Sequence, residues 1–183
     1  MGNKVYLLVG QRGSGKNFYA DNILSHQPEL MLISRDAILV KRFGSTDTCP
    51  YGGAQHFAAE ETKRLLQEAL SVDKGSQIIL DYWTEDSKSR GSLIKCLRQF
   101  GASQVNALYF ITPLNLVKEW FWKKPGIAKM SQMRTLQDQG FTFFSEDAPV
   151  RDHAAFHKLA ANIDSDGFDT VIRINPVESV ISI

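Results

Sequence analysis

The sequence predicts an α/β fold in which a mostly parallel sheet of about five strands lies between two layers of helices. Five short apolar runs, most of them rich in β-branched or aromatic residues, alternate along the chain with segments of helical periodicity. Apolar runs without polar alternation are typical of strands that are buried on both faces. The alternation of strand and helix implies right-handed crossovers and three layers.

The predicted strands are residues 5–9, 30–33, 77–80, 107–111 and 170–174. Helices are expected at residues 18–24 and 37–40, and two longer ones are better marked. Residues 54–73 place apolar side chains at helical spacing and stop before Gly75. Residues 86–100 start at Asp86, a favourable N-cap, and stop before Gly101.

Composition limits the class of protein. A chain of 183 residues that is 43% hydrophobic favours one domain over residues 1–183, with a proper core. Cys49 and Cys96 form no disulfide framework and suit a reducing compartment. We find no signal-peptide pattern and no apolar run near the roughly 20 residues that span a bilayer. These observations predict a cytoplasmic protein without a membrane partner.

A glycine-rich turn joins the first predicted strand to the first predicted helix. Residues 10–16 fit the pattern G-x-x-x-x-G-K of a phosphate-binding loop. Glycines let backbone N–H groups turn toward phosphate oxygens at a helix N-terminus, and Lys16 would supply a charge between the β- and γ-phosphates. The alternative is an ordinary glycine-rich turn. The predicted nucleotide-binding residues are Gly10, Gln11, Arg12, Gly13, Ser14, Gly15, Lys16, Asn17 and, from a later segment, Lys123.

Asn17 departs from the motif, which usually places a Ser or Thr hydroxyl there as a ligand of Mg²⁺. Mg²⁺ prefers oxygen ligands in octahedral geometry, and the Asn17 amide oxygen could serve on a longer side chain. We therefore expect Mg²⁺ to be held by Asn17 and Asp81. A second hypothesis stays open, in which the chain is a nucleotide-binding module with little catalysis.

The ordered motifs of the chain resemble the polynucleotide 5′-kinase group of P-loop kinases, as in phage and bacterial end-healing enzymes. These motifs are the phosphate-binding loop, Ser34-Arg35-Asp36, Ile79-Leu80-Asp81, a basic segment at 118–134, and residues 167–176. No guanine-reading Thr-Lys-x-Asp or Asn-Lys-x-Asp motif is present. The resemblance implies a three-layer P-loop NTPase fold, a helical lid at about 118–139, and ATP as phosphate donor with Mg²⁺ as cofactor.

The resemblance also implies that Asp36 is the general base, which takes the proton of a 5′-hydroxyl. Chemistry agrees, because phosphoryl transfer needs in-line positioning, charge neutralisation and an acceptor for one proton. An Asp after a strand beside the phosphate-binding loop also lies where α/β sheets bind ligands. The alternative is that Asp36 caps the following helix. Asp81 likewise has two interpretations, as a metal or acceptor ligand or as a structural residue at the end of a strand.

The basic segment carries lysines where the resembling kinases carry lid arginines, and Trp120 occupies one such place. We predict that Lys124 acts in catalysis with Lys16 and Asp36, by neutralising charge in the transition state. Lysine does so without the bidentate geometry of arginine. A solvated basic helix is the alternative.

The acceptor side departs further from the resembling kinases, because Tyr82-Trp83 follows Asp81 and no arginine stands one turn after Asp36. Trp83 could stack on a base or pack in the core. The predicted acceptor-binding residues are Asp36, Asp81, Tyr82, Trp83 and Arg42.

Two further patterns bear on function. His153 and His157 have a spacing that can bind zinc, but no third ligand has recognisable spacing, so we predict surface helix residues. The net charge of +1 hides a basic segment, 88–134, with nine Lys or Arg and one Glu. Residues 138–169 hold seven Asp or Glu and two cations. A local basic field favours a phosphate-bearing partner.

These observations favour an ATP-dependent kinase that phosphorylates a hydroxyl of a nucleic acid, most simply a polynucleotide 5′-OH. Another hydroxyl acceptor remains open: a hydroxymethylated base in DNA, a nucleotide or a small molecule. The oligomeric state is not predicted by any pattern in the sequence.

Overall fold

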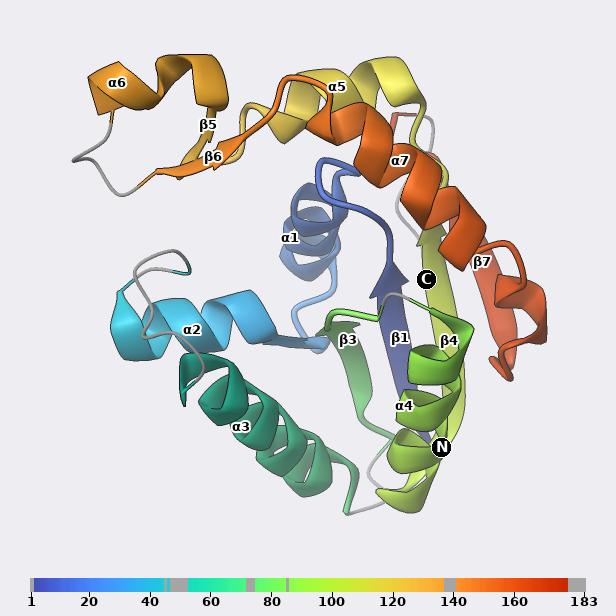
Figure 1. The fold of residues 1–183 in the computed structure, drawn as a ribbon. Coiled ribbons are helices and arrows are strands. Elements are labelled where there is room, and N and C mark those ends of the chain that lie inside the picture. Colours follow the sequence, from blue (N-terminus) through green and yellow to red (C-terminus); the bar gives the residue numbers. More distant parts are fainter. Residues whose placement is uncertain are drawn as a thin grey trace.

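The computed structural model describes residues 2–44, 46, 53–71, 75–84, 86–136 and 141–177 (Figure 1). Its centre is a five-stranded parallel sheet in the order β2-β3-β1-β4-β7. The strands are β1 Asn3–Val9, β2 Met31–Ser34, β3 Gln77–Asp81, β4 Ala102–Phe110 and β7 Thr170–Ile174. Each predicted apolar run falls on one of them, which confirms the predicted α/β class.

Helices connect the strands and cover both faces of the sheet. They are α1 Lys16–His26, α2 Arg35–Phe43, α3 Gly53–Leu70, α4 Ser87–Gln99, α5 Leu114–Phe121, α6 Met133–Leu136 and α7 Ala148–Leu159, with 3₁₀ helices η1 Met130–Gln132 and η2 Ile163–Ser165. The remaining strands, β5 Ile127–Lys129 and β6 Thr142–Phe144, pair in parallel as a separate small sheet. The helices expected at 18–24, 37–40, 54–73 and 86–100 correspond to α1, α2, α3 and α4.

The two faces of β1 show why the fold has three layers. Leu7 belongs to one buried cluster together with Leu66 of α3 and Leu97 of α4. Leu8, on the opposite face of the strand, belongs to a second buried cluster that contains Ile23 of α1. Since successive side chains of a strand point to opposite faces, a central strand with no polar alternation must have apolar helices on both sides.

Caps fix the starts of the helices that border the carboxyl ends of the strands. Ser34 is the N-cap of α2, and its Oγ accepts a hydrogen bond from the Ala37 N–H at 3.3 Å. Asp36 therefore lies in the first turn of α2, and its interpretation as the cap of this helix is wrong. Asp86 caps α4 as predicted, because its Oδ1 accepts from the Ser89 N–H at 2.7 Å.

The segment predicted as a helical lid is only partly helical. After α5 the chain turns at Pro125 and Gly126, the second of which has a φ of 76°, and continues through β5, η1, α6 and β6. α5 itself ends at Phe121, and Pro125, which cannot extend a helix, and Gly126, which adopts the left-handed backbone without strain, keep the chain from resuming it. Residues 137–139 of the predicted lid lie outside the described residues. Figure 1 shows the small β5–β6 sheet and α6 projecting from the ends of α5 and α7.

Candidate functional site

A cavity of about 1370 Å³ opens at the carboxyl ends of β1, β2 and β3. Its walls come from the phosphate-binding loop, the starts of α1 and α2, residues 82–84 after β3, the chain around the end of α5, and one side of α7. Ligands of open α/β sheets bind in this position, outside the carboxyl ends of the strands. Except for Arg42, every residue predicted for the site lines this cavity.

The phosphate-binding loop is packed tightly against α5. Gly13 has a φ of 77°, and a Cβ atom there would lie 3.0 Å from the Val117 carbonyl oxygen and the Phe121 nitrogen. Side-chain hydrogen bonds hold the rest of the turn: Ser14 Oγ donates to the Gln11 carbonyl at 2.8 Å, and Thr112 Oγ1 donates to the Ser14 carbonyl at 2.7 Å. Gly13 is therefore required for two reasons: its backbone is left-handed, and a side chain there would collide with α5.

Lys16 begins α1, and its ammonium group lies over the loop. Nζ donates to the carbonyl oxygens of Gly10 at 2.6 Å and Gln11 at 2.9 Å. Burial lowers the pKa of Lys16 to about 8, an effect that Asp81 partly offsets and Lys124 reinforces. A bound polyphosphate would restore the charged form of this amine.

Asp36 and Lys124 approach each other across the cavity from α2 and from the turn after α5. Asp36 Oδ2 lies 3.5 Å from Lys124 Nζ, and Asp36 Oδ1 lies 3.6 Å from Arg35 Nη1. Both partners of the Asp36–Lys124 pair are partly exposed to the cavity. The structure thus brings a carboxylate and a second, partly exposed cation to the same cavity as Lys16.

Asp81 ends β3 next to the phosphate-binding loop. Ser34 Oγ donates to its Oδ2 at 3.2 Å, and burial raises the pKa of Asp81 while the nearby Lys16 lowers it. Asn17 is exposed at the start of α1 and lines the same cavity. Both side chains offer oxygen, and a cation would relieve the burial of the Asp81 carboxylate. This donor chemistry fits Mg²⁺.

On the acceptor side, Tyr82 and Trp83 line the cavity but differ in burial. Tyr82 is partly buried and packs against the core cluster that contains Leu66 and Leu97. Trp83 is 59% exposed, so the interpretation of Trp83 as a packed core residue is not supported. Arg42 is not among the described residues that line the cavity, and its guanidinium carbon lies 5.7 Å from the centre of the Phe57 ring. Arg42 stands six positions after Asp36 on α2, so the two side chains point about 120° apart.

The cations of the lid segment differ in their partners. Lys123 lines the cavity but forms an ion pair with Glu119 at 2.5 Å. Trp120 also lines the cavity, close to Gly15, where a Cβ atom would lie 3.0 Å from its ring. An aromatic residue therefore stands beside the phosphate-binding loop where the resemblance implied an arginine.

Sequence reasoning missed the contribution of α7. One side of this helix lines the cavity through Ala148, Arg151, Asp152, Ala155, Phe156 and Leu159. Gln11 Nε2 lies 2.8 Å from His153 Nδ1, so α7 also contacts the phosphate-binding loop directly. Burial, and then the adjacent His157, lowers the pKa of His153. In the sequence, only the spacing of His153 and His157 drew attention to α7, because a helix after a lid segment has no recognisable motif.

Acidic residues of the segment 138–169 neutralise part of the basic segment 88–134. Arg90 and Asp166 are both fully buried and form an ion pair at 2.5 Å, and Arg98 pairs with Asp169 at 2.8 Å. Lys123 and Lys124 are also paired, with Glu119 and Asp36, so the sequence-based argument for a basic field is weaker than the count of cations suggested.

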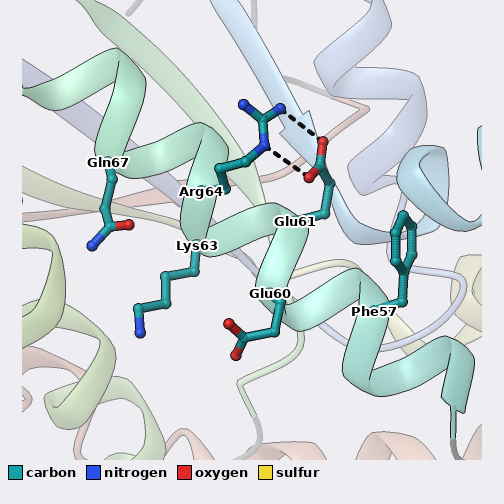
Figure 2. A pocket seen from close by; sticks show the side chains of 6 residues that line it. All are labelled: Phe57, Glu60, Glu61, Lys63, Arg64 and Gln67. Atoms are coloured by element: carbon teal, nitrogen blue, oxygen red, sulfur yellow. Dashed lines mark hydrogen bonds and ion pairs between the residues drawn. The ribbon is translucent and has the colours of Figure 1, made fainter.

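A second hollow lies on the surface of α3 and has a volume of about 410 Å³ (Figure 2). All six lining residues come from this one helix: Phe57, Glu60, Glu61, Lys63, Arg64 and Gln67. Arg64 is already paired with Glu61 at 2.9 Å and Glu68 at 2.8 Å. This hollow holds no residue of the predicted site. In the described part of the chain, no helix combines the length and apolar character needed to cross a membrane.

Comparison with known proteins finds one family model, described as an AAA domain (AAA_33), that matches residues 5–145. No curated protein matches the sequence. A candidate kinase from Chloroflexus aurantiacus has a similar structure, with a TM-score of 0.62, 11% identity, and coverage of 99% of this chain and 93% of that chain.

Two further solved structures share the fold. Shikimate kinase from Acinetobacter baumannii, in complex with shikimate, gives a TM-score of 0.53 at 15% identity, covering 96% of this chain and 85% of that chain. A fungal RNA kinase gives a TM-score of 0.52 at 15% identity, covering 97% of this chain and 77% of that chain.

Proposed function

The chain belongs to the AAA_33 family of AAA domains, and from this premise we propose that it is an ATP-dependent phosphotransferase acting on a hydroxyl of a nucleic acid. The simplest acceptor is a polynucleotide 5′-OH, and residues 1–183 act as one kinase domain. The observation that carries the proposal is the common cavity of Lys16, Asp36 and Lys124. These residues come from three separate parts of the chain.

In the proposed reaction, the acceptor oxygen attacks the γ-phosphorus of ATP while the bond to the β–γ bridging oxygen breaks. Asp36 takes the hydroxyl proton, and ADP leaves. Lys16 and the loop N–H groups hold the phosphates, and Lys124 exchanges its contact with Asp36 for one with the transferring phosphoryl group. Mg²⁺ held by Asn17 and Asp81 would neutralise phosphate charge.

The acceptor side supports a nucleic acid through Trp83. Its exposed ring lines the cavity beyond Asp81, where a base could stack on it. Such stacking contributes about 1–3 kcal/mol per base in single-stranded complexes. The fold shared with a fungal RNA kinase is consistent with this acceptor.

A small hydroxyl compound is the second candidate acceptor. It is favoured by the position of Arg42, which leaves the cavity without the cation predicted to hold an acceptor phosphate. The TM-score to the shikimate kinase, 0.53, is about as high as that to the RNA kinase, 0.52. A hydroxymethylated base in DNA would combine features of both candidates.

Transfer of label from γ-labelled ATP separates the candidates. The acceptors are 5′-OH RNA and DNA oligonucleotides, the same oligonucleotides with 5′-phosphate, hydroxymethylated DNA, free nucleosides and shikimate. We expect label on 5′-OH ends and none on 5′-phosphate ends. Label on another acceptor alone would replace the acceptor, and ATP binding without any transfer would favour a binding module, as Asn17 suggested.

A further inference from the structure

Two histidines on α7 face each other outside the proposed catalytic residues. His153 and His157 lie one helical turn apart, and their Nε2 atoms are 3.1 Å apart. The ring centres are separated by 4.3 Å, and the ring planes are inclined by 74°. His153 is partly buried against the phosphate-binding loop, whereas His157 is exposed to solvent. Ions can therefore reach the pair from outside.

The distance between the two nitrogen atoms is close to the distance between two nitrogen ligands of one metal ion. Imidazole nitrogens bind zinc at about 2.0–2.1 Å, so two such ligands in tetrahedral geometry lie about 3.3 Å apart. The two Nε2 atoms now share a hydrogen bond, and zinc would replace its proton after the rings rotate toward a common point and the nitrogens separate by a few tenths of an ångström. The geometry points to a zinc site formed by His153 and His157 through their Nε2 atoms, with solvent completing the coordination.

Gln11 supplies the second observation. Zinc on Nε2 of His153 leaves the proton of that ring on Nδ1, which then needs an acceptor, as metal-bound histidines usually have. Nδ1 lies 2.8 Å from the Gln11 amide. Gln11 is only 6% exposed, and within the described structure its Oε1 has no hydrogen-bond partner. Half a turn of the amide would place Oε1 at Nδ1, where it accepts the ring proton, and would move Nε2 to the position that Oε1 now occupies.

The site has two protein ligands. Among the described residues, no group of three or more His, Cys, Asp or Glu is placed to hold a metal. We therefore expect exchangeable binding that is weaker than in a closed four-ligand site. Imidazole suits zinc, whereas the oxygen donors of Asn17 and Asp81 suit Mg²⁺, so the two ions would occupy different places. A zinc ion on α7 would hold this helix against the phosphate-binding loop through Gln11.

Zinc titration of the nucleotide-free protein tests this inference without any requirement for phosphoryl transfer. Long-range ¹H–¹⁵N spectra should show zinc-dependent shifts of the Nε2 signals of His153 and His157, and smaller or no shifts for His26 and His56. Calorimetry should show at least 10-fold weaker zinc binding for His157→Gln, which changes an exposed side chain. His56→Gln, an exposed histidine on α3, is the matched control and should bind zinc like the unchanged protein.

Gln11→Leu should weaken zinc binding about 10-fold, as expected when the partner of a metal-bound histidine is removed. If His157→Gln binds zinc as tightly as His56→Gln does, the ion lies elsewhere and the inference is wrong. The same conclusion follows if zinc leaves all the histidine signals unchanged.

Discussion

The two halves of the cavity are built in different ways. The half that would hold the phosphate donor consists mainly of backbone in close contact: a Cβ atom on Gly10 would lie 2.9 Å from Phe110 Cβ, and Ser14 is almost fully buried. The acceptor half consists of side chains with room around them, such as Asp36 and Trp83. Changes in the donor half should therefore abolish activity or stability, and changes in the acceptor half should alter acceptor choice.

The largest effect is expected for Lys16→Met. It removes the charge that we propose binds the phosphates, and phosphate transfer should fall about 1000-fold, as for the loss of a preorganised donor in other enzymes. The assay is transfer from γ-labelled ATP under saturating conditions. Lys63→Met, on exposed α3, is the control and should keep full activity. Substantial transfer by Lys16→Met would mean that the phosphates bind elsewhere.

The close packing of the donor half is tested by a matched pair of glycines. Gly13 and Gly44 both have left-handed backbones, with φ of 77° and 81°, but a Cβ atom meets α5 only at Gly13. Left-handed strain costs about 1–2 kcal/mol for either alanine variant. Gly13→Ala should lose more unfolding free energy than Gly44→Ala in urea titrations, and it should also lose nucleotide affinity. Equal losses would show that α5 yields easily to the extra methyl group.

In the acceptor half, Trp83→Ala should raise the KM for a 5′-OH oligonucleotide about 10-fold, because the stacking surface is lost. The KM for ATP should stay the same, and Trp83→Phe should recover most of the acceptor affinity. Steady-state kinetics with each substrate varied in turn provide the measurement. An unchanged oligonucleotide KM in Trp83→Ala would favour a small acceptor.

The smallest effect concerns protons. The pKa of Lys16 is about 8 in the empty site, so about half of these amines are neutral at pH 8. Phosphates favour the charged form, and ATP binding at pH 8 should take up about half a proton per site, falling toward zero near pH 6.5. Calorimetry in buffers of different ionisation enthalpy measures this uptake. Lys16→Met should abolish it, and unchanged uptake would assign the proton to another group.

The sequence predicted the sheet and the phosphate-binding loop because both depend on local patterns. Strands buried on two faces need continuous apolar runs, and the loop needs glycines at fixed spacing. Contacts between residues far apart in the sequence were harder to predict. The position of Arg42 against Phe57 depends on the rotation of α2, and the contact of His153 with Gln11 joins residues 142 positions apart. Pro125 and Gly126 did carry a local signal that the lid would not be one helix.

Asp36 links the two halves, because it lies in the acceptor half, contacts Lys124 and acts electrostatically on Lys16 of the donor half. The most direct test of the proposed catalytic site compares Asp36→Asn with the unchanged protein in two assays, ATP binding by calorimetry and label transfer to a 5′-OH oligonucleotide. We expect ATP affinity within about 3-fold of the original and a loss of transfer of about 100-fold or more, as for a missing general base. Retained transfer by Asp36→Asn would contradict the assignment of Asp36 as the base.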